Sequence, residues 1–263
     1  METTLCYSTT CFGPETGPDE LLHWLELLRA TGVELVEISR KHHQLAKRAE
    51  RIRELGIRVW SVHGTLPTGA ITGTEEELRR AVAAEVARME DCAAFAPCPY
   101  VIHYLNRFND PVYGERFRTA IELLIRANES LGFTLAIETA PYKPQTDERY
   151  PDSAEIAAFV RSFANEKVRM TIDLNHSNLN EDIFAVCRNC CGLIANIHVS
   201  DNHGEREEHL VPGSGVIPLK AVMRELRDCG YTGPCNLELH LPGVPDQAAI
   251  ADINRTVRAQ LAQ

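Results

Sequence analysis

Basic segments are missing from this sequence. Its 263 residues include 27 Lys+Arg against 37 Asp+Glu, which gives a formal net charge of −10. A protein of this charge repels phosphate backbones and anionic lipid surfaces over about a Debye length. Binding to nucleic acid or to a membrane would need a local basic patch or a bound metal to compensate, so we expect neither as a partner.

Long apolar runs are missing as well. Nowhere do about 18 apolar residues follow one another, which is the length that a membrane-spanning helix needs. Residues 1–8 contain neither the basic region nor the apolar region of a secretion signal. We therefore expect no membrane-spanning segment, no secretion and a cytoplasmic location.

The cysteines do not form the framework of a disulfide-rich protein. There are nine, an odd number, and they are scattered along the chain, which suits a reducing compartment where thiols stay free. Cys187 and Cys190 form a single CxxC pattern with Cys191 adjacent, but a zinc ribbon needs a second pair at matching spacing. We interpret these residues as buried helix thiols, with redox or metal chemistry as the alternative.

A glycine-rich phosphate turn is absent after the first predicted strand, where residues 9–14 read Thr-Thr-Cys-Phe-Gly-Pro. This argues against a doubly wound open sheet. The chain instead repeats one unit, an amphipathic stretch that ends near a glycine and is followed by a short β-rich run. The predicted strands are Thr4–Ser8, 33–38, 57–62, Tyr100–Tyr104, 133–137, Val168–Leu174, 193–197 and Cys235–Leu239. The predicted helices are 19–30, 42–54, 75–95, 115–130, 153–163, 181–190, 218–228 and 246–261.

The third helical pattern is the clearest. Thr74 and Glu77 form a Thr-x-x-Glu capping box, and apolar residues recur at three- or four-residue steps from Leu78 to Met89. Alternating strands and helices predict parallel βαβ units, and eight of them close most economically as a (β/α)₈ TIM barrel. The sequence therefore predicts an α/β protein with one domain, 1–263, and an active site at the C-terminal ends of the strands.

Histidines and carboxylates occupy the ends of six successive predicted strands. These residues are His63, His103, Glu138, Asp173, His198 and Glu238. His176 follows three residues after Asp173, and the loop after the seventh strand adds Asp201, His203, Glu207 and His209. Taken singly, His103 could be a core histidine and Glu238 a helix cap or a salt-bridge partner.

Together these residues would place several charges at one concave mouth, where burying even one without compensation is costly. A divalent cation is the simple compensation. Mixed imidazole and carboxylate ligands suit Zn²⁺, Mn²⁺, Co²⁺ or Fe²⁺, and Mg²⁺ is also open. The number of bound ions, one or more, is left open by the sequence.

The motifs around these residues resemble the xylose isomerase-like TIM barrel superfamily, which includes sugar phosphate isomerases and epimerases and the endonuclease IV repair enzymes. The resemblance spans roughly residues 5–240. It rests on Val62-His63-Gly64, Ile102-His103-Tyr104, Ala136-Ile-Glu138-Thr, Thr171-Ile-Asp173-Leu-Asn-His176, Ile197-His198-Val-Ser-Asp201, His209-Leu-Val-Pro-Gly-Ser-Gly215 and Leu237-Glu238-Leu.

The resemblance implies specific site residues. In epimerase-like members one divalent metal is held at positions matching Glu138, Asp173, His198 and Glu238, and the two glutamates act as the acid/base pair. In endonuclease IV three zinc ions occupy the same mouth, and the additional matching positions are His63, His103, His176, Glu207 and His209. Position 207 departs from that pattern, because the repair enzymes have the shorter aspartate there.

The first functional hypothesis is a metal-dependent isomerase or epimerase acting on a sugar, a sugar phosphate, a sugar acid or a polyol. Glu138 and Glu238 would face each other across the barrel and serve the two faces of a planar cis-enediolate. His176 would be a further catalytic residue that orients substrate oxygens. Trp60 and Tyr104 are candidate substrate-binding walls, as is Tyr7, with barrel core as the alternative for the tryptophan.

Two alternatives remain open. One is a metal-dependent lyase or dehydratase on the same scaffold, and the other is an endonuclease IV-like hydrolase of abasic DNA. The loops after the first three strands lack interleaved arginines and aromatic residues that would follow a duplex, and Arg40 and Lys41 are the only adjacent basic pair near the mouth. The Gly213–Gly215 segment fits either a phosphate cradle or a tight loop. A small-molecule substrate is expected, and a homo-oligomer is left open.

Overall fold

The computed structural model describes residues 3–12, 20–106, 110–140, 150–179, 181–241, 243 and 245–262. Eight strands form one sheet in the order β7-β6-β5-β4-β3-β2-β1-β8, and every adjacent pair in this order is parallel. The strands are β1 Leu5–Ser8, β2 Leu35–Ile38, β3 Arg58–His63, β4 Pro99–His103, β5 Thr134–Glu138, β6 Val168–Asp173, β7 Ile194–His198 and β8 Cys235–Leu237.

The sheet closes on itself between β7 and β8. Val199 and Leu237 form a parallel bridge there. The Val199 amide donates to the Asn236 carbonyl at 2.7 Å, and the Glu238 amide donates to the Val199 carbonyl at 3.1 Å. Eight parallel strands therefore form a nearly closed barrel, and the predicted fold class is confirmed.

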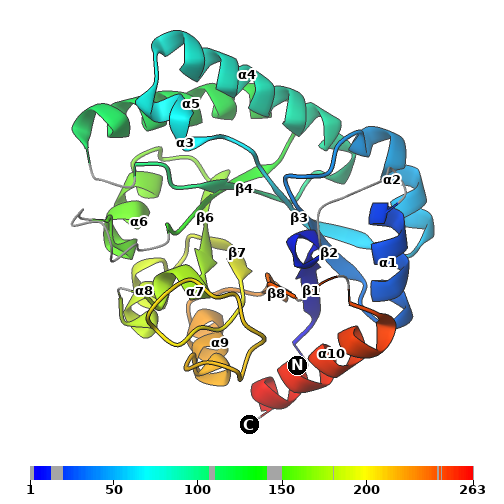
Figure 1. Cartoon of the computed structure of the whole chain (residues 1–263). Helices are drawn as coiled ribbons and strands as arrows, with labels where there is room; N and C mark the ends of the chain where they lie inside the picture. The colour runs from blue at the N-terminus through cyan, green and yellow to red at the C-terminus, as the bar shows by residue number, and fades with distance from the viewer. Residues whose placement is uncertain are drawn as a thin grey trace.

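The helices surround the barrel as an outer ring (Figure 1). Eight of them match the predicted helices: α1 Glu20–Ala30, α2 Leu45–Glu54, α4 Glu75–Asp91, α5 Pro111–Asn128, α6 Ser153–Arg161, α8 Ile183–Asn189, α9 Leu219–Asp228 and α10 Gln247–Ala262. Two short helices were not predicted, α3 Thr68–Thr72 and α7 Leu174–Ser177. Both follow the C-terminal end of a strand, so they help to shape the mouth of the barrel.

Local signals in the sequence explain where several of these elements begin and end. At the start of α4, the Thr74 hydroxyl accepts from the Glu77 amide and the Glu77 carboxylate accepts from the Thr74 amide, so the predicted capping box forms. Gly132 and Gly192 precede β5 and β7 with φ of +88° and +75°. This left-handed conformation lets the chain turn from helix into strand, and glycine adopts it readily because it has no side chain.

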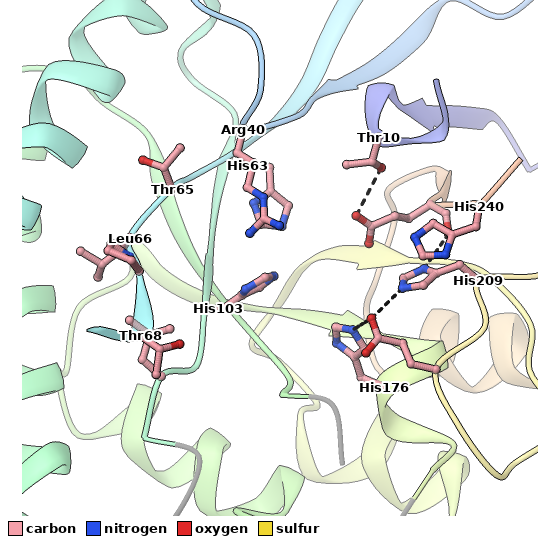
Figure 2. A pocket seen from close by; sticks show the side chains of 14 residues that line it. Thr10, Arg40, His63, Thr65, Leu66, Thr68, His103, His176, His209 and His240 are labelled. Atoms are coloured by element: carbon pink, nitrogen blue, oxygen red, sulfur yellow. Dashed lines mark hydrogen bonds and ion pairs between the residues drawn. The ribbon is translucent and has the colours of Figure 1, made fainter. Parts of the chain in front are cut away.

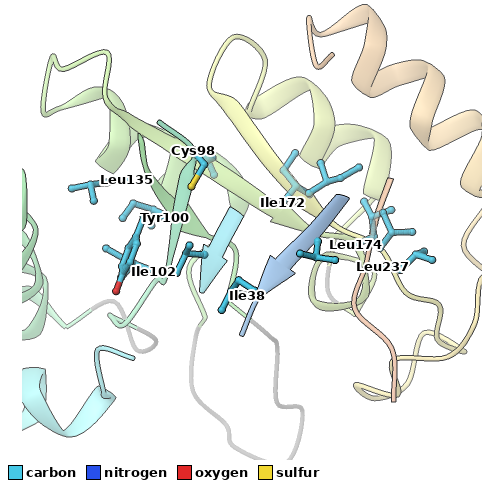
Figure 3. Packing of buried hydrophobic residues seen from close by; sticks show 14 of the residues in the cluster. Ile38, Cys98, Tyr100, Ile102, Leu135, Ile172, Leu174 and Leu237 are labelled. Atoms are coloured by element: carbon cyan, nitrogen blue, oxygen red, sulfur yellow. The ribbon is translucent and has the colours of Figure 1, made fainter. Parts of the chain in front are cut away.

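Strand side chains alternate between two environments. One set points outward and packs under the helices (Figure 3). Figure 3 labels six strand residues of this apolar layer, Ile38, Tyr100, Ile102, Leu135, Ile172 and Leu237, together with Cys98 just before β4 and Leu174 at the start of α7. The other set points into the barrel and includes buried polar residues such as Glu37, Ser61 and Asn236. The apolar layer holds the helices in place, and the inward set builds the interior and the mouth.

The expectation that all thiols stay free is wrong at one pair. Cys191, after α8, and Cys229, after α9, form a disulfide across a sequence separation of 38 residues. Helices α8 and α9 pack side by side, which brings two sequence-distant cysteines together. Cys187 and Cys190 are buried free thiols, as interpreted. Within the described residues, every helix is too short or too polar to cross a membrane.

Candidate active site

The predicted histidines and carboxylates converge at the C-terminal end of the barrel. They form three groups, and within each group potential ligand atoms lie within 4.8 Å of one another. The groups are His63, His103 and Glu138; Glu138, Asp173, His198 and Glu238; and His176, Glu207 and His209. All nine residues that the sequence singled out as potential ligands are therefore brought together, and Glu138 belongs to two groups.

The central group has His198 Nδ1 at its middle. This nitrogen lies 2.8 Å from Glu138 Oε1, 3.0 Å from Glu238 Oε2 and 3.9 Å from Asp173 Oδ2. Glu138, Asp173 and His198 are the last residues of β5, β6 and β7, and Glu238 directly follows β8. Four neighbouring strands thus direct three carboxylates and one imidazole to a single point.

One buried carboxylate oxygen in this group has no hydrogen bond from the described residues. Asp173 caps α7, since its Oδ1 accepts from the His176 amide at 3.0 Å, but its Oδ2 has no hydrogen bond among the described residues. Glu138 Oε2 instead faces two histidine nitrogens, His103 Nε2 at 3.0 Å and His63 Nε2 at 3.4 Å. Buried charged oxygens are costly unless compensated, so the donor set fits a divalent cation that accepts oxygen and nitrogen ligands.

Glu37 is a further residue of the candidate site, and the strand-end pattern did not predict it. Its Oε2 lies 3.0 Å from His198 Nε2. The ring proton on Nε2 is donated to Glu37, which reserves Nδ1 for a metal, and this is how supporting carboxylates orient histidine ligands. Without a metal, burial lowers the pKa of His198, but the charges of Glu238, Glu37 and Glu138 outweigh burial and raise this pKa well above its usual value. The signal was present in the sequence, because Glu37 interrupts an apolar run one residue before the end of β2, at an inward position.

Glu37 is itself held from several sides. Its Oε2 also accepts hydrogen bonds from Ser61 Oγ at 2.6 Å, Asn196 Nδ2 at 3.3 Å and Asn236 Nδ2 at 3.2 Å. These donors come from β3, β7 and β8. They fix the position of the carboxylate, and although burial raises the pKa of Glu37, the charge and hydrogen bond of His198 lower it.

Three other histidines are oriented in the opposite sense. In each, Nδ1 lies 2.9 to 3.0 Å from a backbone carbonyl oxygen, which leaves Nε2 directed at a carboxylate. The histidines are His63, His176 and His209, and their carbonyl partners are those of Gly64, Thr139 and Glu238. Backbone geometry therefore selects the nitrogen that each ring presents.

The two flanking groups have comparable geometry. His103 Nε2 lies 3.0 Å and His63 Nε2 lies 3.4 Å from Glu138 Oε2. On the other side, Glu207 Oε1 lies 3.0 Å from His209 Nε2 and 3.5 Å from His176 Nε2. Although position 207 departs from the repair-enzyme pattern, the longer glutamate reaches both histidines.

Electrostatic coupling shifts the pKa values of these groups. Burial lowers the pKa of His176, but the charge of Asp173 and the hydrogen bond to Glu207 outweigh it and raise this pKa to about 10. Burial also lowers the pKa of His209, but the hydrogen bond to Glu207 and the charge of Asp173 outweigh it and raise this pKa to about 9. Burial raises the pKa of Glu138, but His103 and His198 hold it well below its usual range. Protons on the imidazoles balance the acids when no metal does so.

A cavity of about 420 Å³ opens over the three groups (Figure 2). This volume is in the range of small-molecule sites. Its lining residues are Thr10, Arg40, His63, Thr65, Leu66, Pro67, Thr68, His103, Leu105, His176, Glu207, His209, Glu238 and His240. His240 was not anticipated, and its ring centroid lies 4.4 Å from that of His209.

The predicted substrate-binding role of Trp60 is wrong. The register between β2 and β3 shifts at this residue, and the indole Nε1 donates to Asn196 Oδ1 at 2.9 Å. Trp60 lines a separate cavity together with Arg58 and Pro234, next to the starts of β3 and β8. A mid-strand residue at a bulge therefore fills the base of the barrel instead of its mouth.

The same prediction is wrong for the tyrosines. Tyr104 is buried and its ring packs at 5.3 Å from Phe117 and 5.4 Å from Phe159, in the helix layer. His103 points inward, and its chain neighbour therefore points outward. Tyr7 is also buried, and its hydroxyl donates to Asn254 Oδ1 of α10 at 2.8 Å.

The Gly213–Gly215 segment is a tight loop and not a phosphate cradle. The amides of Gly213 and Gly215 both donate to Asp201 Oδ2 at 2.9 Å, and the Ile217 amide donates to Asp201 Oδ1 at 3.0 Å. These amides are therefore already occupied. A side chain at position 215 would lie 2.2 Å from the Asn202 carbonyl oxygen, so this close approach requires glycine.

The fold and the convergent ligands define a (β/α)₈ barrel enzyme scaffold with its polar site at the C-terminal face. Comparison with protein families makes this specific. The chain belongs to the xylose isomerase-like TIM barrel family, whose pattern matches residues 25–259.

Several similar proteins carry the names of sugar isomerases or epimerases. A putative hydroxypyruvate isomerase of Streptomyces coelicolor is 33% identical over 187 residues, which cover 66% of this chain and 63% of that protein, under two thirds of its length. A fructoselysine 3-epimerase of Escherichia coli O157:H7 is 39% identical over 46 residues, 18% of this chain and 17% of that protein.

Solved structures share the fold at low sequence identity. An L-ribulose 3-epimerase superposes with a TM-score of 0.81 at 17% identity, over 100% of this chain and 95% of that one. The IolI protein, solved with a bound zinc atom, has a TM-score of 0.78 at 18% identity, over 98% of both chains. At these identities the likeness shows the fold alone.

Proposed function

We propose that the protein is a metal-dependent isomerase or epimerase of a sugar, a sugar phosphate or a related keto-polyol, and that it works by carboxylate-mediated proton transfer through a cis-enediolate. One observation carries the proposal: Glu138 and Glu238 approach the same nitrogen of His198 at 2.8 and 3.0 Å from different strands. The sugar isomerases and epimerases among the relatives support the same reaction class.

A single divalent cation would be held by Glu138, Asp173, His198 and Glu238. When bound, it would polarise a substrate carbonyl and the adjacent hydroxyl, which acidifies the hydrogen on the carbon between them. The Asp173 Oδ2 atom, which has no hydrogen bond from the described residues, supports this assignment. The flanking groups offer further ligands, so more than one ion can be accommodated.

The protein's own residues would move the proton. The histidines around Glu138 hold its pKa low, so the carboxylate is ionised and able to accept a proton from carbon. In an epimerisation Glu138 would keep the proton that it removed, and Glu238, after taking a proton from solvent, would deliver it to the opposite face of the enediolate. His176, fixed by the Thr139 carbonyl, would direct Nε2 to the substrate oxygens.

The experiment is a panel of ketohexoses, ketopentoses, their phosphates and hydroxypyruvate, run in deuterated water with Mn²⁺, Co²⁺ or Zn²⁺. We expect at least one substrate to be isomerised and to gain deuterium on carbon. Glu138→Gln and Glu238→Gln should each lower turnover by about 10²- to 10⁴-fold, the contribution typical of general acid/base catalysis. Full activity in Glu238→Gln, or complete retention of the substrate hydrogen, would refute the enediolate mechanism.

A second candidate is hydrolysis of a phosphodiester at abasic DNA. The observation that favours it is the full set of nine ligands in three groups, including Glu207, because clustered metals can clamp the attacking and leaving oxygens of a phosphoryl centre. Metal-dependent incision of an abasic duplex, compared with Glu138→Gln, tests this activity. We expect no incision above that control, since the net charge of −10 opposes duplex binding.

A further inference from the structure

One positively charged side chain, that of Arg40, reaches into the acidic mouth of the barrel. Arg40 follows β2 and lines the 420 Å³ cavity on the same side as His63 (Figure 2). Among the described residues that line this cavity, Arg40 is the single lysine or arginine. Its neighbour Lys41 instead donates to the Phe12 carbonyl and lies 5.7 Å from the centroid of the Trp24 ring. Of two adjacent basic residues, the fold therefore directs one into the cavity.

The Arg40 side chain has no partner among the described residues, although the mouth is rich in acids. Those acids are engaged elsewhere. Glu207 Oε1 contacts His176 and His209, and Glu238 contacts His198 and the Thr10 hydroxyl. An exposed guanidinium that leaves nearby carboxylates to histidines keeps its donors available for a ligand.

The chemistry of a guanidinium identifies the group it would bind. Its planar fork of donors matches a carboxylate or a phosphate in a bidentate manner, and such charge-assisted hydrogen bonds are stronger than neutral ones. An anionic substrate, in turn, needs a positive charge at this acidic mouth. An anionic substrate entering a mouth lined by Glu207 and Glu238 would be repelled unless a positive charge received it.

We infer that the substrate carries an anionic group, a phosphate or a carboxylate, and that Arg40 is the specificity-determining residue that binds it. This inference rests on the proposed function. The reacting carbons lie at Glu138 and Glu238, while the anionic end lies on the β2–β3 side of the cavity. The hydroxyl of Thr68, which lines the same cavity, is available to the polyol chain between these two ends of the substrate.

Binding without turnover tests the inference. Sorbitol, sorbitol 6-phosphate and gluconate have no ketone and cannot be isomerised, so calorimetry with Mn²⁺-loaded protein reports affinity alone. We expect at least one anionic ligand to bind about 10- to 100-fold more tightly than sorbitol, as a hydrogen bond to a charged group can supply. Arg40→Ala should bring this ratio close to one, and the ligand that loses affinity identifies phosphate or carboxylate.

Two variants control for charge and for geometry. Arg206→Ala removes a positive charge from the loop beside Glu207, where the Arg206 side chain is 75% exposed and lies outside the cavity. This variant should still bind the anionic ligand more tightly than sorbitol. Arg40→Lys keeps the charge without the fork and should retain part of it. Equal affinity for charged and neutral ligands, or a preference unchanged in Arg40→Ala, would overturn the inference.

The outcome is separable from that of the proposed function. Isomerisation of neutral ketoses without any Arg40-dependent anion preference would overturn the subsite and leave the reaction class intact. An Arg40-dependent preference with no isomerisation of any substrate would overturn the reaction class and support the subsite.

Discussion

The two ends of the barrel differ in how their polar groups are satisfied. At the base, Trp60 donates to Asn196, and Arg227 donates to the carbonyls of Tyr231 and Gly233 at 2.9 and 2.8 Å. At the mouth, a buried oxygen of Asp173 has no hydrogen bond from the described residues, and the buried Glu138 carboxylate faces histidine nitrogens on both of its oxygens. The base is built for stability, whereas the mouth holds charges that the fold alone does not satisfy and that a ligand can.

The largest expected effect at the mouth is the loss of metal from His198→Ala. Purified wild type should carry at least one divalent metal per chain, because four ligands converge on one point. Removing His198 deletes a direct ligand, so affinity should fall by more than the roughly 10- to 100-fold typical of losing a supporting residue. Elemental analysis after dialysis measures this. If wild type takes up no stoichiometric Mn²⁺, Co²⁺ or Zn²⁺, the interpretation of the mouth as a metal site is wrong.

Metal binding at the mouth should strengthen with pH. Burial lowers the pKa of His209, but Glu207 and Asp173 raise it to about 9. In the metal-free protein this proton stabilises the fold fully below about pH 6.5, the unfolded value, and the contribution is lost as the pH rises towards 9. A metal bound in the flanking group of His176, Glu207 and His209 must displace this proton. The increase in melting temperature on adding Mn²⁺ should therefore be larger at pH 9 than at pH 6.5, and the reverse order would contradict this.

Glu37 links the interior of the barrel to the mouth, and Glu37→Gln should weaken metal binding by about 10- to 100-fold although residue 37 is not a ligand in any group. The amide keeps the size of the side chain but supports His198 without a charge. Glu34→Gln is the matched control, since Glu34 precedes β2 and pairs with Arg29 on the surface. Calorimetric titration of both variants with Mn²⁺ distinguishes them. Equal losses would show that residue 37 has no special role.

The smallest effect is expected at the base. Trp60→Phe removes the donor to Asn196 and should lower the free energy of unfolding by about 1–3 kcal/mol, with turnover and metal content unchanged. Urea denaturation and the ketose assay measure the two quantities. A large loss of activity at unchanged stability would restore Trp60 as a substrate-binding residue.

The elements that the sequence predicted well are those with strong periodicity and clear end signals. Helix α4 starts at the capping box expected for it, and each of the eight strands falls within two residues of its predicted bounds. The short helices α3 and α7 were missed because four or five residues are too few to show a helical period.

The candidate ligands were predictable for a topological reason. Parallel strands of a barrel end at one face, so a histidine or carboxylate at each strand end must meet its counterparts there. That argument places residues in a region but says nothing of orientation. It could not anticipate Glu37 behind His198, the choice of nitrogen in each imidazole, or the position of Arg40 in the cavity.

The sequence by itself determined the barrel, the order of its elements and the set of polar residues at the mouth, because periodicity, caps and strand ends are local properties. Only the tertiary structure decided which side chains meet. A register shift turned Trp60 to the base, alternation turned Tyr104 into the helix layer, and packing of α8 on α9 joined Cys191 to Cys229. Each outcome depends on contacts between residues far apart in the chain, which no local pattern specifies.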